Sequence, residues 1–151
     1  MANGTVRVRL ATSRDVASWV ELAREVEPLF GPMPDIATHI ERGIARGTAI
    51  VAVDADNQVA GAMLLSRDDR PHHIHWLAVR ASARRQGAGS ALVNAALHRW
   101  NDGAPIEVVT FGADHPAGAA ARALYSRCGF QFQEITDDGP EGGSRERWIR
   151  R

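Results

Sequence analysis

The chain has 151 residues, of which 44% are hydrophobic and 24% charged, and its 18 Lys and Arg residues balance 18 Asp and Glu residues. This composition is typical of a folded globular protein and excludes extensive disorder. A net charge of zero gives no basis for nucleic-acid or membrane-surface binding. The single cysteine, Cys128, excludes an internal disulfide and a multi-cysteine metal site. No apolar run approaches the ~20 residues that span a bilayer, and the first ten residues lack a signal-peptide core. We therefore expect one cytoplasmic domain, residues 1–151.

The sequence pattern of the N-terminal half predicts a strand, two helices and a β-hairpin. Residues 5–10 alternate polar and apolar side chains, as in a half-buried strand. A capping box at Thr12 and Asp15 precedes apolar residues at helical spacing, which predicts a helix with one buried face. The segment EPLFGPMPD, with three prolines and a glycine, interrupts that helix. The remaining predicted elements here are a helix over 36–45 that ends near Gly47, and strands over 48–53 and 58–65 around the turn sequence DADN.

The C-terminal half continues with alternating strands and helices. After a charged loop at 67–71, we predict strands over 74–79, 106–111, 130–135 and 145–149, and helices over 87–100 and 116–128, the second ended by Gly129. The order is β-α-α-β-β-β-α-β-α-β-β. Because the hairpins must be antiparallel, this order predicts an α/β fold with a mixed sheet of about seven strands flanked by about four helices.

The stretch RRQGAGSAL places Gly87 and Gly89 between a predicted strand and a predicted helix. A backbone without Cβ atoms lets a ligand approach closely. The first amides of the helix are unpaired and lie at the positive end of its dipole, so the turn can bind a pyrophosphate, with Arg84 and Arg85 adding positive charge. The alternative to a pyrophosphate-binding site is that Gly87 and Gly89 only form a tight turn. A P-loop is excluded because Gly-Lys-Ser/Thr is absent, and the dinucleotide fingerprint is excluded because Leu92 replaces its third small residue.

The pattern Arg-x-x-Gly-x-Gly, here Arg84, Gly87 and Gly89, resembles the acyl-CoA signature of the GNAT superfamily of N-acetyltransferases. The preceding WLAV and the following SAL are similar to that family as well. The stretch ARALYSRCGF resembles the family helix that ends in Leu-Tyr-x-x-x-Gly-Phe. The resemblance extends over nearly the whole chain and implies the GNAT fold. One departure is Gly118, where many members carry an asparagine, so a hydrogen bond to the pantetheine arm is missing or comes from elsewhere.

The resemblance implies that acetyl-CoA is bound with its pyrophosphate on the glycine turn and its pantetheine arm paired with the preceding strand. The implicated residues are Leu77, Ala78 and Val79 on the strand and Arg84, Arg85, Gln86, Gly87, Ala88, Gly89 and Ser90 at the turn. Core packing of Leu77 and Val79 is compatible with this role, because the backbone binds while the side chains pack. No metal is implied.

The resemblance also implies direct attack of a primary amine on the thioester in a ternary complex. An alkyl amine with a pKa near ~10 is mostly protonated at neutral pH and must lose a proton. The oxyanion needs a fixed donor, for which the Leu77 amide is a candidate. The departing thiolate needs a proton, and Tyr125, the only tyrosine in the chain, falls at the family's general-acid position. The alternative is a helix tyrosine whose hydroxyl bonds at the surface.

The histidines of HHIHWLAV are candidates for the proton acceptor. His73 and His75 are two residues apart and therefore share one face of a strand, and histidine exchanges protons near neutral pH. The segment resembles the His-x-His-x-Leu-Ala-Val of the serotonin N-acetyltransferases, where the histidines are proposed to relay the amine's proton. A purely structural pair and a relay through water stay open. A metal site lacks a supporting cysteine or carboxylate at ligand spacing. We expect His72 to be exposed on the opposite face, while His39, His98 and His115 have no motif around them.

The acceptor is expected between the segment EVEPLFGPMPD and the loop DDGPEGG, with Leu29, Phe30 and Met33 as an apolar wall. Acidic residues of the two segments would suit a cationic amine with an apolar body, unless they are only solvated loop charges. These acidic residues are Glu25, Glu27, Asp35, Asp137, Asp138 and Glu141. Small-molecule and peptide amines both remain possible, including peptide N-termini, lysines, polyamines, aminoglycosides and arylalkylamines.

Two other functions stay open at this point. One is a catalytically silent acyl-CoA-binding or regulatory module. The other is an oligomeric interaction protein in which the Gly-x-Gly is only a turn. A homodimer is common in the family, although no feature of the sequence requires one.

Overall fold

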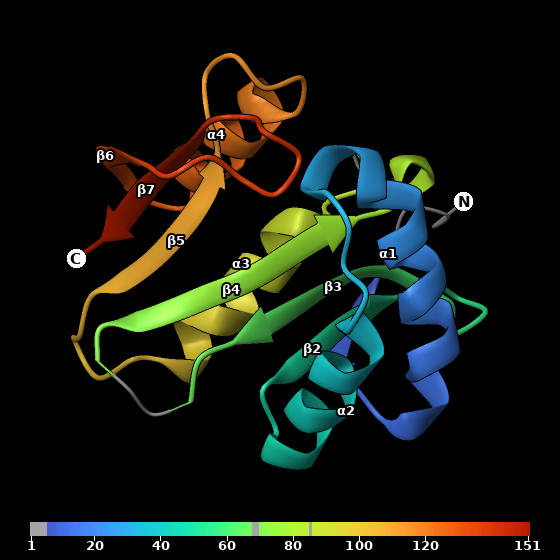
Figure 1. The fold of residues 1–151 in the computed structure, drawn as a ribbon. Coiled ribbons are helices and arrows are strands. Elements are labelled where there is room, and N and C mark those ends of the chain that lie inside the picture. Colours follow the sequence, from blue (N-terminus) through green and yellow to red (C-terminus); the bar gives the residue numbers. More distant parts are fainter. Residues whose placement is uncertain (1–5, 68–69, 85) are drawn as a thin grey trace.

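A mixed seven-stranded sheet organises the part of the chain that the structure describes, residues 6–67, 70–84 and 86–151 (Figure 1). The structure is a computed structural model. In chain order its elements are β1 (Arg7–Leu10), α1 (Val16–Phe30), α2 (Ile36–Arg46), β2 (Ala49–Val53), β3 (Val59–Leu65), β4 (His72–Val79), α3 (Ala88–Arg99), β5 (Ile106–Phe111), α4 (Gly118–Arg127), β6 (Gln131–Thr136) and β7 (Arg145–Arg150). Short 3₁₀ turns lie at Ser13–Asp15 and Ala81–Ala83. The expected α/β fold is confirmed.

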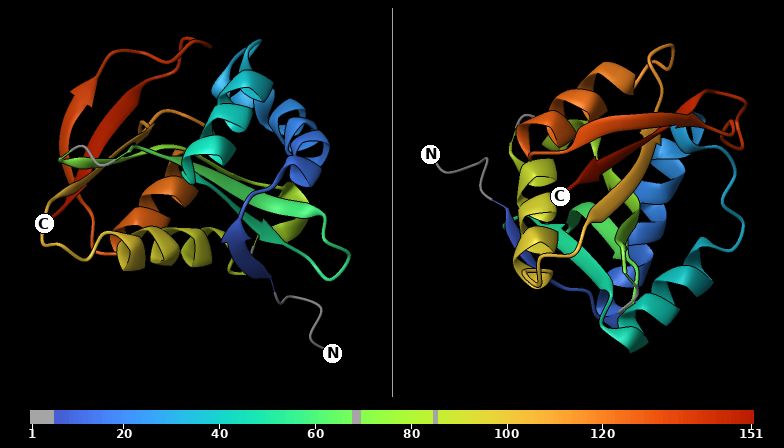
Figure 2. Two further views of the ribbon diagram at one scale, coloured as in Figure 1. Left: turned by 90° about the horizontal axis from the view of Figure 1, so that it is seen from below. Right: turned by 90° about the vertical axis from the view of Figure 1, so that its left-hand side faces the viewer.

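Helices cover both faces of the sheet. Figure 2 shows α1 and α2 on one side and α3 and α4 on the other. One core cluster, which includes Trp19 and Leu22 of α1, packs on the first face, and a second, which includes Leu92 and Val93 of α3, packs on the opposite face. The strands β2 and β3 lie between these layers, which explains why their sequences, AIVAV and VAGAMLL, are continuous apolar runs rather than alternating ones.

The strand order is β1-β2-β3-β4-β5-β7-β6, and the pairing of β4 with β5 is parallel while the other pairings are antiparallel. The parallel pairing joins His72 to Ile106, His73 to Glu107 and Ile74 to Val108. Beyond that point β4 and β5 diverge (Figure 1).

A bulge in β4 coincides with the point of divergence. Leu65 of β3 lies opposite Ile74, whereas Leu64 lies opposite Trp76, so His75 is the additional residue. A bulge bends its strand and changes which face the following side chains occupy. Accordingly, Ile74 belongs to the core cluster under α3, and Trp76 packs against the cluster under α1.

Several element boundaries differ from the expectation, and two of the differences have a clear physical cause. Helix α1 continues through Pro28 to Phe30, and the chain turns at Gly31, which has a φ of +89°. The proline removes only one hydrogen bond near the end of the helix, and Gly31 N–H still donates to the carbonyl of Glu27. Strand β4 begins at His72, two residues early, because tertiary pairing with β5 extends it. Thr5 of the first predicted strand lies outside the described residues.

The expectation that His72 is exposed is wrong. Its side chain is buried, and the ring stacks on the indole of Trp100 at a centroid distance of 4.6 Å. His72 Nε2 lies 3.0 Å from a carboxylate oxygen of Asp102, which also pairs with Arg70. Trp100, at the end of α3, therefore buries the His72 side chain against the core.

We expect the charge of Asp102 to stabilise the fold in a pH-dependent way. The backbone N–H of Ala104 and then the ring of His72 lower the pKa of this carboxyl to about 2. Because the folded-state pKa is depressed, the stabilisation is present above the unfolded-state value of ~3.9 and is lost as the pH falls toward the folded-state value. Asp102→Asn should lower the free energy of unfolding at neutral pH, and the difference from the wild type should shrink toward about pH 3. Urea unfolding at several pH values measures this.

The matched control is Asp137→Asn, which removes an exposed loop carboxylate. It should leave stability unchanged throughout the pH range. A loss in Asp102→Asn that stays the same from neutral pH down to about pH 3 would show that the charge has no part in it.

Candidate active site

A cleft of about 970 Å³ opens where β4 and β5 diverge. The glycine turn before α3 lines one end, and aromatic side chains line the other. Between them lie the exposed edge of β4, the inner face of α4 and the side chains of His75 and Tyr125. The cleft therefore brings together residues from both predicted motifs.

The glycine turn leaves open space beside its backbone. Gly87 has a φ of +79°, and a Cβ atom built on it would have no other atom within 4 Å. Gly87 precedes α3, whose first helical hydrogen bond runs from Ala91 N–H to Gly87 O, so the amides before Ala91 have no partner within the helix. The turn can accept an anion at these amides.

The other predicted turn residues differ in position. Arg84, Ala88, Gly89 and Ser90 line the cleft with Gly87. The side-chain amide of Gln86 instead donates to Ser82 O. Arg85 lies outside the described residues. A Cβ on Gly89 would lie 3.2 Å from Leu124 Cδ2, so this glycine also lets α3 pack closely on α4.

The strand pairing of β4 with β3 determines which backbone groups of β4 point into the cleft. Arg80 N–H donates to Ala60 O, which makes these two residues a hydrogen-bonded pair of the antiparallel ladder. Since such pairs alternate along a strand, the N–H and C=O groups of Leu77 and Val79 point away from β3, into the gap. Ala78 also lines the cleft, but its backbone groups face β3. The edge can therefore pair with an extended ligand at Leu77 and Val79.

His73 and His75 lie on one face, as expected from their spacing. Their rings stack at a centroid distance of 5.7 Å with an interplanar angle of 10°. His75 is exposed and lines the cleft, while His73 lies behind it, with Nδ1 3.7 Å from a carboxylate oxygen of Glu107. Glu107 is not predictable from the sequence, because only the parallel register of β4 and β5 places it beside His73.

Tyr125 lies on α4 and is only 4% exposed, although it lines the cleft. Its ring contacts Phe130 edge-on at a centroid distance of 5.5 Å. Burial raises the pKa of the phenol well above its ordinary value, so the hydroxyl keeps its proton at neutral pH. The alternative of a hydroxyl placed at the surface does not fit this burial.

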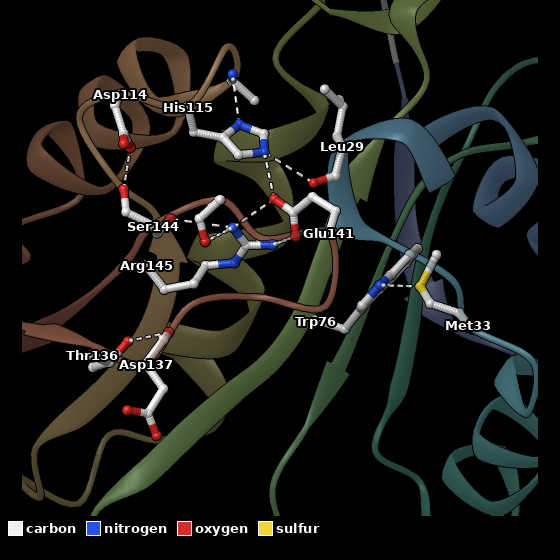
Figure 3. A network of polar contacts seen from close by, with 12 residues as sticks. Leu29, Met33, Trp76, Asp114, His115, Thr136, Asp137, Glu141, Ser144 and Arg145 are labelled. Atoms are coloured by element: carbon white, nitrogen blue, oxygen red, sulfur yellow. Dashed lines mark hydrogen bonds and ion pairs between the residues drawn. The ribbon is translucent and has the colours of Figure 1, made fainter.

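The far end of the cleft is held by a polar network that the sequence did not reveal (Figure 3). His115 is buried; its Nε2 lies 3.0 Å from both the carbonyl of Leu29 and a carboxylate oxygen of Glu141. Ala117 N–H donates to His115 Nδ1. Glu141 also forms a two-oxygen ion pair with Arg145. The network joins the end of α1, the loop before α4 and the β6–β7 loop.

Of the residues expected near the acceptor, the apolar ones line the cleft and the acidic ones do not. Leu29, Phe30 and Met33 line the cleft. Glu25 instead accepts the Ala81 N–H and pairs with Arg80. Among the described residues that line the cleft there is no Asp or Glu, so the structure favours loop charges that are solvated or paired elsewhere.

Gly118, which replaces the asparagine of many family members, begins α4. A Cβ atom built there would collide with the backbone carbonyl of Gly112. An asparagine would therefore require the loop between β5 and α4 to move.

The described residues hold no group of three His, Cys, Asp or Glu side chains arranged to bind a metal ion. Within the same residues, no helix combines the length and hydropathy of a membrane span.

The family model of the acetyltransferase (GNAT) domain matches residues 45–132, which is more than half of the chain. No curated protein matches the sequence significantly. A chain of the NatC complex bound to Gag peptide and CoA superposes with a TM-score of 0.75 at 19% identity, over 96% of this chain and 97% of that one. A phosphinothricin acetyltransferase from Sinorhizobium meliloti, in complex with AcCoA, gives 0.74 at 20% identity, over 97% and 88%.

Ard1 from Thermoplasma volcanium gives a TM-score of 0.75 at 18% identity, over 96% of both chains. At such identities these likenesses establish the fold, while the match to the family model extends from the end of α2 to the start of β6. The chain therefore belongs to the GNAT acetyltransferase family.

Proposed function

We propose that this protein transfers the acetyl group of acetyl-CoA to a primary amine by direct attack in a ternary complex. The observation that carries the proposal is the single cleft that contains an open glycine turn, a free strand edge, His75 and the buried Tyr125. Two of the similar structures were solved with CoA or AcCoA bound, which supports the same donor here. We take residues 1–151 as one such domain.

The residues of the turn and of the strand edge fit the donor. Amides at the start of α3 would hold the pyrophosphate together with Arg84, and the outward backbone groups of Leu77 and Val79 would pair with the pantetheine arm. When bound, acetyl-CoA supplies a thioester carbonyl as the electrophile. The Leu77 N–H points into the gap, where it can donate to the carbonyl oxygen as that oxygen becomes negative.

The proton of the acceptor ammonium has an ordered route. His75, which lines the cleft, accepts this proton directly or through water, and the stacked ring of His73 lies behind it. Glu107 acts as a positioning residue, because its carboxylate lies beside the His73 ring. The order His75, His73, Glu107 leads from a residue that lines the cleft to two that do not.

Tyr125 supplies the second proton transfer. Its hydroxyl donates a proton to the thiolate that leaves when the new C–N bond replaces the C–S bond. The ammonium first gives one proton to the histidine side of the cleft. The attacking nitrogen gives up a second proton after the C–N bond forms, and that proton restores the tyrosine hydroxyl whose own proton has passed to the sulfur. One proton is therefore released for each acetyl group transferred.

Gly87→Val should weaken binding of CoA strongly. The valine side chain would fill the open space of the turn and force a β-branched residue into a left-handed conformation. The matched control is Gly47→Val, because Gly47 has the same left-handed conformation and open surroundings but lies at the end of α2, outside the cleft. Calorimetric titration with CoA should show a loss only in Gly87→Val. Equal affinity in both folded variants would place the donor elsewhere.

Tyr125→Phe should lower kcat by ~10² to 10⁴ while the KM for acetyl-CoA changes little. Phenylalanine keeps the contact with Phe130 and removes only the hydroxyl. Thiol release from acetyl-CoA in the presence of a panel of amines measures the rate. A variant within about threefold of the wild type would refute the general-acid role, since such a change is below ~1 kcal/mol. A wild-type protein that binds CoA but releases no thiol with any amine would instead be a silent acyl-CoA-binding module.

His75→Gln, His73→Gln or both should lower kcat at neutral pH and remove or shift the acidic limb of the pH profile. Histidine takes up a proton between about pH 5 and 8, so activity should fall as the pH drops through this range. Part of the activity should return at high pH, where more of the amine is already neutral. The control His39→Gln changes an exposed histidine on α2. If the double variant keeps the wild-type profile and rate, the pair is structural.

A further inference from the structure

The end of the cleft opposite the glycine turn is built from a row of aromatic rings. Phe30 lies 5.5 Å from Trp76 and 5.0 Å from Phe111, measured between ring centroids. Trp76 continues the row to Trp19, and Phe111 continues it to His115, at 4.1 Å. Phe30, Trp76 and Phe111 line the cleft, together with Met33, whose sulfur accepts the Trp76 indole N–H. An acceptor bound here contacts flat apolar surfaces.

The charges of the cleft disfavour an acceptor with several positive charges. Its charged side chains, apart from His75, are the cations Arg84, Arg127 and Arg145, and no carboxylate lines it among the described residues. A second ammonium group of the acceptor would therefore lose water without gaining a counter-charge, which is costly. A single amine avoids this cost because it is deprotonated before it reacts.

Contacts between three loops bound the aromatic end of the cleft. The β6–β7 loop contacts the end of α1, since a Cβ on Gly31 would lie 2.9 Å from Pro140 Cβ. His115 bonds both Leu29 O and Glu141, and Glu141 holds Arg145, whose guanidinium carbon lies 4.8 Å from the centroid of Phe111 (Figure 3). Loops from three parts of the chain thus meet at this end of the cleft, and we infer that they limit the length of the acceptor.

We propose that the acceptor is a small monoamine with a flat apolar body, rather than a polyamine, an aminoglycoside or a polypeptide, and that Phe30 selects for that body. The inference rests on the proposed acetyl transfer and narrows its substrate class. Phe30 is suited to this role because it is partly exposed to the cleft and contacts both Trp76 and Phe111.

The first test compares three acceptors under the same acetyl-CoA concentration: phenethylamine, spermidine and a short peptide that begins with phenylalanine. The kcat/KM for phenethylamine should exceed the values for the other two by about tenfold or more. If spermidine or the peptide is the better acceptor, acetyl transfer stands and the acceptor class is wrong. If none of the three is acetylated although the protein binds CoA, the amine transfer and the acceptor class are both wrong.

The second test uses Phe30→Leu, with Phe132→Leu as the matched control. Phe132 is a half-exposed phenylalanine of β6 whose ring contacts Trp148, outside the cleft. Phe30→Leu should raise the KM for phenethylamine by about threefold to tenfold, because a ring–ring contact is lost, with the KM for acetyl-CoA unchanged. Phe132→Leu should change neither value. Equal KM values for phenethylamine in the two variants would overturn the role of Phe30.

Discussion

The separation of β4 from β5 is the constraint on which the site depends. Three parallel pairs hold the strands together from His72 to Ile74, and the bulge at His75 follows at once. The separation leaves the outward N–H and C=O groups of Leu77 and Val79 without a neighbouring strand in the described part of the chain. An extended arm that contains amides can pair with these groups, which supports the proposed binding of the donor along this edge.

The bulge also sorts the side chains of β4 between the two faces. In a regularly alternating strand Trp76 would share a face with Ile74 and pack under α3, but the bulge turns it toward Phe30 on α1. His73 and His75 stack together, as their spacing of two residues allows. The bulge thus brings Trp76 into the aromatic wall of the cleft that His75 also lines.

The aromatic end of the cleft depends on ionic contacts between loops that are distant in the sequence. Hydrogen bonds from Arg145 lower the pKa of the Glu141 carboxyl, and the charge of Arg145 lowers it further. Glu141 is therefore ionised at neutral pH and holds both Arg145 and His115. The Ala117 N–H bonds His115 Nδ1, which leaves Nε2 as the donor toward Leu29 and Glu141. Neutral histidine is sufficient for all three contacts.

The sequence alone determined the order of the elements, the fold family and the main candidate residues, because these depend on local periodicity and on short motifs. Gly87 is predictable from its turn, Tyr125 from LYSRCGF, and the shared face of His73 and His75 from their spacing. Helix α1 extends past Pro28 because the last turn of a helix tolerates the loss of one N–H donor. The loss of a single hydrogen bond does not alter the hydrophobic periodicity, so the sequence pattern does not reveal where this helix ends.

Only the tertiary structure decided what lies beside each of these residues. Glu107 reaches His73 through strand pairing, Trp100 buries His72, and His115, Glu141 and Arg145 meet from separate loops. The acidic residues near the acceptor segments looked available in the sequence, yet Glu25 and Glu141 are bound to arginines in the fold. Contacts of this kind join residues far apart in the chain, and their partners are fixed by strand register and loop packing, which no local pattern encodes.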